Sequence, residues 1–336
     1  MIVLGVESSC DECAVAVVKD GSELLGQVVH SQIEEHEQYR GVVPEIASRQ
    51  HTQHILPVYR QAIRESGITA ADIDIVAVTT HPGLSGSLLV GTTFAKGLAL
   101  GLDRPLVSVN HILAHLYAPR LSGPVDWPCL GLLVSGGHTM IVRMDDWQTL
   151  TVLGATVDDA CGEAFDKVAR YHGFGYPGGK AVDALASGGD ETAYEFPGSS
   201  LKGDSHDLDL SYSGIKTAVT VQASRFLRPG KEASAENLAA SFQRVAIGMI
   251  MKRLDRAVQQ TGIHRLVVGG GVAANSRLRR ELAARTHLQL AIPPLSLCTD
   301  NAAMVAAIGY EYAISGRFVN LDVPVGARVA GYKAAY

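Results

Sequence analysis

The sequence predicts an α/β fold in which one supersecondary pattern is used twice. Apolar runs that are typical of strands alternate with longer segments that are typical of helices. A strand–turn–strand pattern with a small polar tip occurs over residues 2–18 and again over 130–142. Glycine-rich turns follow three of the apolar runs, after Thr79, Val134 and Val268. The alternation indicates the fold class, and the repeated hairpin suggests two homologous halves.

The first half begins with a predicted β-hairpin. Ile2–Val6 and Ala14–Val18 are apolar runs, and the acidic and hydroxyl residues of 7–12 form an oxygen-rich tip between them. The other elements of this half are expected in the order helix 44–65, strand 73–79, glycine-rich loop 81–87, helix ending at 102, strand 106–109 and a helix opened by Asn110.

The second half repeats the hairpin and then adds helices. Its strands are Leu130–Val134 and Met140–Val142, and the small polar residues 135–139 form the tip. Asp158 or Asp159 is expected to cap the helix that follows. The half is completed by a helix over 235–261, a strand over 265–268 and a helix from near Asn275.

Composition indicates a folded protein without a global attraction to nucleic acid or lipid. The chain has 336 residues, enough for about two domains, and its 47% hydrophobic and 19% charged residues exclude a disordered chain. The formal net charge of −5 supplies no basic field for RNA or for anionic membranes. There is no signal-peptide pattern and no long uncharged apolar stretch, and the five scattered cysteines are typical of a reducing compartment. We therefore expect a cytoplasmic protein without a membrane segment.

Two histidines have the spacing of metal ligands. His111 and His115 lie four residues apart on a predicted helix, so both imidazoles share one face. Asp300, at a predicted loop-to-helix start, is the natural carboxylate to complete the set. The residues between the histidines include no glutamate, so the motif is not that of a zinc protease. The alternatives are a pair of partly buried histidines that are hydrogen-bonded to the backbone, or Asp300 as a helix N-cap.

The glycine-rich turns favour nucleotide binding. Glycine lets backbone N–H groups approach a phosphate closely, although no turn matches a P-loop or a dinucleotide fingerprint. Asp11 and Glu12, at the first hairpin tip, could face a cation–phosphate site or could be solvated turn residues. Arg277, Arg279 and Arg280 form a basic cluster, with further cations at Lys252, Arg253 and Arg256. For this cluster a solvated helix face is favoured over contact with RNA phosphates.

The ordered motifs resemble a known family. They are Gly5-Val6-Glu7-Ser8-Ser9-Cys10-Asp11-Glu12, Val43-Pro44-Glu45-Ile46-Ala47-Ser48-Arg49, Pro82-Gly83-Leu84, Asn110-His111 with His115, Val134-Ser135-Gly136-Gly137-His138-Thr139, Gly162-Glu163-Ala164-Phe165-Asp166-Lys167, Tyr176-Pro177-Gly178-Gly179, Ser213-Gly214-Ile215-Lys216-Thr217, Gly270-Gly271-Val272-Ala273-Ala274-Asn275 and Cys298-Thr299-Asp300-Asn301. From about residue 2 to 310, the chain resembles the tRNA N6-adenosine threonylcarbamoyltransferases of the bacterial TsaD type, formerly called O-sialoglycoprotein endopeptidases.

The resemblance implies a fold and a reaction. The fold is the duplicated actin/hexokinase/Hsp70-like ATPase fold, with two related subdomains and a cleft between them. We expect a first subdomain over 1–108, completed by 310–336, and a second over 109–309 that carries the metal and nucleotide loops. The implied reaction moves threonylcarbamoyl from threonylcarbamoyl-AMP to N6 of adenosine 37 in tRNAs that read codons starting with A, a step of t6A biosynthesis.

The resemblance also implies site residues, cofactors and partners. His111, His115 and Asp300 match the metal ligands, usually of iron and sometimes of zinc, and Mg²⁺ could accompany the nucleotide. The positions that match substrate-binding residues are Leu133, Val134, Ser135, Gly136, Gly137, Asp166, Gly179, Asp183 and Asn275. Asp11 and Glu12 are the catalytic candidates. The implied partners are tRNA, threonylcarbamoyl-AMP, an inactive paralogue (TsaB type) and a small P-loop ATPase (TsaE type).

The chain departs from the family pattern at a few positions, and other functions stay open. Leu133 stands where archaeal and eukaryotic relatives often have a tyrosine ligand, which leaves three protein ligands here, and His81 replaces a frequent glycine. A small-metabolite kinase on the same fold would use the phosphate loops but not an imidazole site. A metallopeptidase would need a base that the histidine motif lacks, and a non-catalytic scaffold would not need the two histidines with Asp300.

Overall fold

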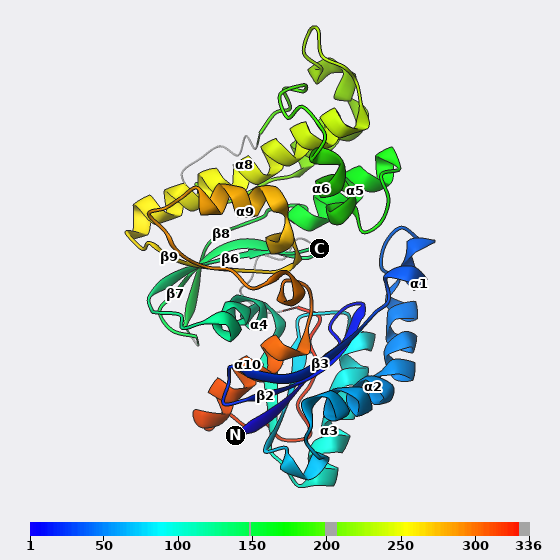
Figure 1. The fold of residues 1–336 in the computed structure, drawn as a ribbon, viewed down its shortest axis with the longest axis vertical. Coiled ribbons are helices and arrows are strands. Elements are labelled where there is room, and N and C mark those ends of the chain that lie inside the picture. The colour runs from blue at the N-terminus through cyan, green and yellow to red at the C-terminus, as the bar shows by residue number, and fades with distance from the viewer. Residues whose placement is uncertain (148, 199–206, 329–336) are drawn as a thin grey trace. The chain divides into compact units, whose positions relative to one another are not determined.

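The computed structural model describes residues 1–147, 149–198 and 207–328, and the chain forms two compact units (Figure 1). The first unit contains residues 1–125 and the described residues from 293 onward, and the second contains the described residues of 126–292. These bounds differ from the predicted subdomains of 1–108 and 109–309, because segments on either side of the second unit pack on the first sheet. Of the predicted segment 310–336, the part after residue 328 lies outside the described residues.

The sheet of the first unit has five strands in the order β3-β2-β1-β4-β5. β1, β2 and β3 form an antiparallel meander, and β4 and β5 run parallel to β1. Their bounds are β1 (Ile2–Glu7), β2 (Glu12–Lys19), β3 (Glu23–Ser31), β4 (Ile75–His81) and β5 (Leu106–Asn110). The predicted hairpin is confirmed, and its first strand reaches one residue further, to Glu7.

The sheet of the second unit repeats this topology. Its order is β10-β9-β6-β7-β8, with β6, β7 and β8 antiparallel and with β9 and β10 parallel to β6. The bounds are β6 (Cys129–Val134), β7 (Thr139–Met144), β8 (Leu150–Ala155), β9 (Arg265–Gly269) and β10 (Gln289–Ala291). Each sheet therefore consists of a three-stranded antiparallel meander, and two further strands extend the sheet on the other side of its first strand and run parallel to that strand. The duplication that the repeated hairpin suggests is confirmed.

Helices cover both faces of the first sheet. Leu4 and Val6 of β1 point into a core with Ile55 and Ala95, whereas Gly5 points to the opposite face. There a Cβ on Gly5 would lie 2.3 Å from the carbonyl oxygen of Ala302, so only glycine permits this close packing. The helices of this unit are α1 (Ile33–Glu37), α2 (Pro44–Ser66), α3 (Ser85–Leu102), α4 (His111–Tyr117) and α10 (Ala302–Ile314).

The second unit contains the longest described helix. Its helices are α5 (Cys161–His172), α6 (Gly178–Ala186), α7 (Ser213–Val221), α8 (Ala235–Thr261) and α9 (Ser276–Ala283). The predicted strands and the helix over 235–261 are found at or within a few residues of their expected bounds. No helix in the described ranges combines the length and the apolar character that a membrane crossing requires.

The cap predicted for α5 is wrong. Ala160 occupies the N-cap position, and its N–H is accepted by Glu163 at 3.3 Å. Asp158 instead accepts the backbone N–H of Tyr212 at 2.7 Å, and Asp159 forms ion pairs with lysines. Both carboxylates are thus used by donors that are distant in the sequence, which local spacing could not show.

Candidate functional site

A capped helix start positions the two histidines. The side chain of Asn110 accepts hydrogen bonds from the backbone N–H groups of Ile112 and Leu113, at 2.9 and 3.3 Å, so α4 begins where β5 ends. The four-residue spacing places the rings of His111 and His115 on one face, with their centroids 4.6 Å apart. The predicted helix geometry is therefore confirmed, and both rings stand at the carboxyl end of β5.

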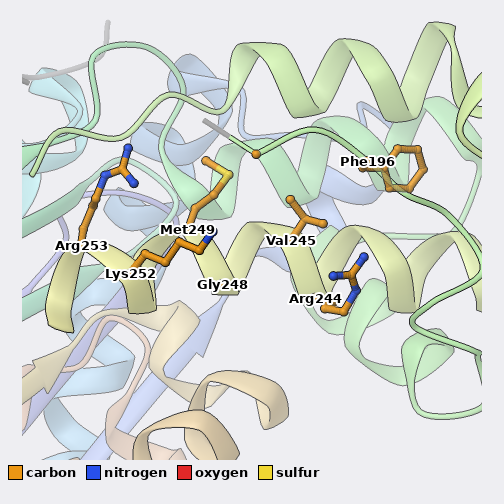
Figure 2. A pocket seen from close by; sticks show the side chains of 8 residues that line it. Phe196, Arg244, Val245, Gly248, Met249, Lys252 and Arg253 are labelled. Atoms are coloured by element: carbon orange, nitrogen blue, oxygen red, sulfur yellow. The ribbon is translucent and has the colours of Figure 1, made fainter. Parts of the chain in front are cut away.

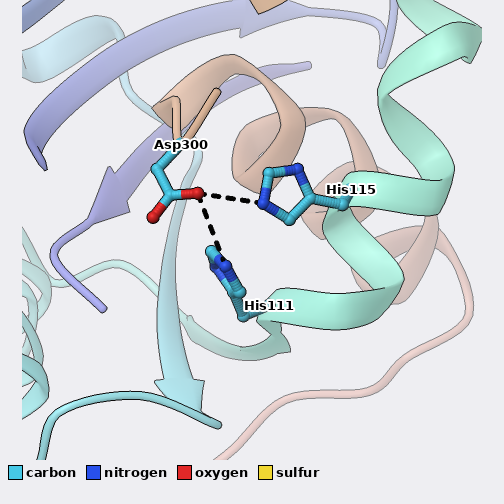
Figure 3. A group of neighbouring side chains, drawn as sticks. All are labelled: His111, His115 and Asp300. Carbon is cyan, nitrogen blue, oxygen red and sulfur yellow. Dashed lines mark hydrogen bonds and ion pairs between the residues drawn. The ribbon is translucent and has the colours of Figure 1, made fainter. Parts of the chain in front are cut away.

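Asp300 completes a cluster with the two histidines (Figure 3). Its Oδ1 lies 3.0 Å from Nε2 of His115 and 3.6 Å from Nε2 of His111, and all three ligand atoms lie within 4.8 Å of one another. Asn301, not Asp300, caps α10, because its Oδ1 accepts the N–H of Met304 at 3.0 Å. The alternative in which Asp300 serves as the helix cap is therefore excluded.

A second carboxylate lies behind His111. Glu7 is fully buried, and its Oε2 lies 3.1 Å from Nδ1 of His111 while accepting the hydroxyl of Thr79 at 2.6 Å. The other oxygen of Glu7 accepts the N–H of Ser9 at 2.6 Å, and the Ser9 hydroxyl lies 3.1 Å from the same Nδ1. A carboxylate on Nδ1 fixes the ring orientation and leaves Nε2 for a metal ion. Neither Glu7 nor Thr79 was predicted as a site residue from the sequence, where the only signal was an acidic residue at the end of an apolar strand.

The carboxylates around His111 control its charge. Burial favours the neutral ring, but Asp300 and Glu7 outweigh burial and raise the pKa of His111 to about 9. Burial likewise disfavours the charged form of Glu7, yet the neighbouring His111 ring holds the pKa of Glu7 below its ordinary value. In the metal-free protein, an imidazolium therefore supplies the positive charge that two carboxylates require.

The donor set fits a divalent transition metal. Two imidazole nitrogens and one carboxylate oxygen are ligands of the catalytic type, which leave at least one position for water or substrate. The buried Glu7 behind His111 is the outer carboxylate that such sites commonly use.

Metal affinity is expected to rise with pH. Because a protonated imidazole cannot coordinate, binding must displace one proton from His111 below about pH 9. One displaced proton makes the apparent affinity rise about tenfold per pH unit up to that value. Titration of the metal-free chain with Co²⁺ or Zn²⁺ between about pH 6 and 9 measures this slope. Affinity that stays constant over this range would contradict the assignment of His111.

The predicted catalytic pair lies near Asp300. Asp11 and Glu12 are half-buried at the tip and start of β2. Burial, the charge of Asp11 and the charge of Asp300 raise the pKa of Glu12 well above its ordinary value. The Cys10 carbonyl, one residue earlier, lies 2.9 Å from Nε2 of the buried His51, which anchors the tip to α2.

The tip of the second hairpin is packed against two glycines. The N–H of Gly162, in the first turn of α5, donates to the carbonyl of Ser135 at 3.1 Å, and a Cβ on Gly162 would lie 2.7 Å from that oxygen. A Cβ on Gly270, which has φ +91°, would lie 2.4 Å from the carbonyl oxygen of Val134. Val134 is a buried strand residue, as is Leu133 before it, so this structure exposes neither of these two predicted substrate residues to a ligand.

The other predicted substrate residues form two anchored groups in the second unit. Asp166 of α5 accepts the N–H of Gly178 at 2.8 Å, at the start of α6, which places Gly179 in the first turn. Asp183 accepts hydrogen bonds from the amides of Asn275 and Gln243, at 3.3 and 3.0 Å.

Ser276 also binds Asp183, and Gln243 links it to Asn275. The N–H and hydroxyl of Ser276 donate to Asp183 at 3.1 and 2.8 Å. The Oε1 of Gln243 accepts from Asn275 at 3.2 Å. Neither Gln243 nor Ser276 was predicted as a substrate residue from the sequence. The sequence pattern indicates only that Gln243 lies within the long helix and that Ser276 lies at a helix start.

The duplicated sheets define the class of protein. Component A of the (R)-2-hydroxyglutaryl-CoA dehydratase of Acidaminococcus fermentans superposes with a TM-score of 0.57 at 13% identity, over 94% of this chain and 99% of that one. Full-length HypF in its phosphate- and nucleotide-bound form gives 0.61 at 14% identity, over 93% of this chain and 46% of that one. The fold is thus the predicted actin/hexokinase/Hsp70-type ATPase fold, here with a histidine–aspartate cluster in its first unit.

Sequence comparison identifies the family within this class. The family model of TsaD, the tRNA N6-adenosine threonylcarbamoyltransferase, matches residues 23–307. The chain is 49% identical over 332 residues to the tRNA N6-adenosine threonylcarbamoyltransferase of Treponema denticola, covering 99% of this chain and 98% of that protein. The chain therefore belongs to the TsaD family, whose activity is threonylcarbamoyl transfer in t6A biosynthesis. The kinase, metallopeptidase and scaffold alternatives are set aside.

Proposed function

We propose that this chain transfers the threonylcarbamoyl group of threonylcarbamoyl-AMP to N6 of adenosine in the anticodon loop of tRNA, with a divalent metal held by His111, His115 and Asp300. The observation that carries the proposal is the cluster itself, in which two Nε2 atoms and one carboxylate oxygen converge in front of the buried Glu7. Such a bound ion would act as a Lewis acid for oxygens of the donor. The substrate base is single-stranded in a loop, so it can be presented without opening a duplex.

The reaction needs positioning more than it needs a strong base. The N6 amine is a weak nucleophile, because its lone pair is delocalised into the adenine ring. Its nitrogen attacks the carbamoyl carbon, the bond from that carbon to the phosphate oxygen breaks, AMP leaves, and N6 loses one proton. Asp11 and Glu12 are the proposed pair for moving this proton, and Glu12 with its raised pKa is suited to hold it. Orientation and charge stabilisation supply the rest of the rate increase.

We assign the nucleotide part of the donor to the second unit. Ser135, Gly136 and Gly137 form the tip that we assign to the phosphate. The donors are the backbone N–H groups of Gly136 and Gly137, because the N–H of Ser135 donates to the carbonyl of His138 at 2.8 Å, and a Cβ on Gly136 would meet no described atom within 4 Å. Asp166, Gly179, Asp183 and Asn275 are the proposed adenosine contacts. Support comes from the hydrogen bonds that fix Asp183 and Asn275 in one arrangement before any ligand arrives.

We also propose which metal and which protein partners this chain uses. Iron is the proposed metal, with zinc as the alternative, because imidazole suits both ions. Mg²⁺ would accompany bound nucleotide. An inactive paralogue of the TsaB type and a small P-loop ATPase of the TsaE type are the proposed protein partners, and the cytoplasm is the proposed compartment.

Mass spectrometry of tRNA nucleosides tests the function. The metal-loaded chain is incubated with threonylcarbamoyl-AMP and unmodified tRNA, with and without the two proposed protein partners. The expected result is t6A in the digested tRNA and release of one AMP per modified nucleoside. Absence of t6A under every combination of metal and partner would overturn the proposal. A parallel reaction with tRNA whose target adenosine is replaced by guanosine serves as the control.

A further inference from the structure

A pocket of about 260 Å³ lies along α8 in the second unit (Figure 2). None of its lining residues belongs to the metal cluster or to the proposed adenosine contacts. The lining consists of Phe196, Gly198, Arg244, Val245, Gly248, Met249, Lys252 and Arg253. Lys252 and Arg253 stand toward one end of the row of labelled side chains, and Arg244 stands toward the other. We call this the α8 groove.

The α8 groove carries positive charge without acidic neighbours in its lining. Lys252 is exposed and forms no ion pair or hydrogen bond with any described residue. Arg244 donates through Nε to the carbonyl of Glu191 at 2.8 Å, and Arg253 donates through Nε to the carbonyl of Asp209 at 3.1 Å. These carbonyls orient the guanidinium groups but do not neutralise them. Three cations therefore face a space whose other lining side chains are apolar.

Several nearby basic residues are neutralised, in contrast to the α8 groove. Arg277 forms ion pairs with Glu191 and Glu281, and its side chain is only 14% exposed. Arg256 pairs with Asp207 in the same way. The positive charge of the basic cluster at 277–280 is thus partly neutralised by carboxylates of the same unit. In a chain of net charge −5, the α8 groove is a local site where cations remain for an anionic partner.

Gly248 has no packing reason to be glycine. It lies inside the 27-residue helix α8, where glycine is the least favourable residue after proline. A Cβ built on Gly248 would meet no described atom within 4 Å, so close packing does not exclude a side chain. What a side chain would fill is the α8 groove itself, between Arg244 and Lys252. An unfavourable residue that keeps a basic groove open points to a ligand.

We infer that the α8 groove binds the sugar–phosphate backbone of the tRNA substrate. Arg244 and Lys252 are eight residues apart, about 12 Å along the helix axis, which suits a ligand with more than one anionic group. The buried Phe196 and Met249 form an apolar floor that accepts the sugar face and limits competition from water. The inference rests on the proposed function, because tRNA is the polyanion that this function supplies.

Binding of labelled, unmodified tRNA to the full chain tests the inference. Gly248→Leu fills the α8 groove with a better helix former, so its melting temperature should equal or exceed that of the parent chain. Its affinity for tRNA should fall about tenfold, as for the loss of a charge-assisted contact. Lys252→Ala should weaken binding roughly three- to tenfold at low salt and should lower the slope of log affinity against log salt by about 1.

Arg64→Ala is the matched control, because Arg64 is an exposed cation on α2 in the other unit and forms no ion pair with a described residue. It should bind tRNA as the parent chain does. Parental affinity and salt slope in both Gly248→Leu and Lys252→Ala would overturn the inference. A second result would also overturn the inference: free AMP displaces tRNA by binding at a single site, and Gly248→Leu abolishes this AMP binding. That result would identify the α8 groove as a mononucleotide site.

The nucleoside assay separates this inference from the proposed function. Both α8 groove variants should form t6A with a raised KM for tRNA and with kcat within about twofold of the parent value. A parent chain that binds tRNA through the α8 groove but forms no t6A would overturn the proposed function alone. Normal t6A formation with parental KM in both variants would overturn the inference alone.

Discussion

His111→Ala is expected to lose the bound divalent ion and more than about 100-fold of the transfer rate while the chain stays folded. The variant removes one of three converging ligand atoms, and the remaining His115 and Asp300 cannot hold a metal ion with comparable affinity. It also removes the imidazolium partner of the buried Glu7 and leaves that carboxylate with only its bonds from Thr79 and Ser9, at a cost of about 3–5 kcal/mol. A domain that is stable by about 5–15 kcal/mol tolerates this loss.

Metal content per chain, nucleoside mass spectrometry and thermal melting together measure these effects. His54→Ala is the matched control, because His54 lies on α2 in the same unit and stacks on His30 instead of facing Asp300. Glu7→Gln provides an intermediate case, since it keeps the size of the side chain but removes its charge from behind His111. We expect metal affinity about 10- to 100-fold weaker in that variant. A metal-free His111→Ala chain that modifies tRNA at the parental rate would refute the metal role.

Gly162→Ala is expected to reduce transfer about 100-fold through the hairpin tip of the second unit. The added Cβ would lie 2.7 Å from the carbonyl oxygen of Ser135 and 2.9 Å from the nitrogen of Gly136. These are backbone atoms that cannot rotate away, so the tip must shift relative to α5. Alanine itself favours the helix by about 1 kcal/mol over glycine, which offsets part of the strain. The loss should therefore appear in the kinetics for threonylcarbamoyl-AMP more than in the melting temperature.

Gly97→Ala is the control for this effect. Gly97 lies in α3, and a Cβ there would meet no described atom within 4 Å. It should melt at or slightly above the parental temperature and transfer at the parental rate. Steady-state kinetics with the donor varied, at saturating tRNA, separate the two variants. Equal kcat/KM in Gly162→Ala and in the parent chain would show that the tip does not position the donor.

Local sequence patterns predicted much of the fold, because their causes are local. Apolar runs and turn residues gave strands such as β1 and β6 to within a residue or two of their bounds. The helix containing His111 and His115 followed from its cap and from helical periodicity. The predicted cap of α5 was wrong because its cause is not local: Asp158 accepts hydrogen bonds from Tyr212 and its neighbours, which lie far along the chain.

The α/β class, the repeated hairpin and the pairing of two histidines on one helix face follow from the sequence, because these features depend on neighbours within a few residues. Its ordered motifs also pointed to the family. Other features are visible only in the folded chain: Glu7 stands behind His111, Gln243 joins Asp183 to Asn275, and Arg277 is neutralised while Lys252 is not. Each of these facts depends on which buried donor meets which acceptor across strands and helices. That choice is made by packing of the whole unit, which no local pattern encodes.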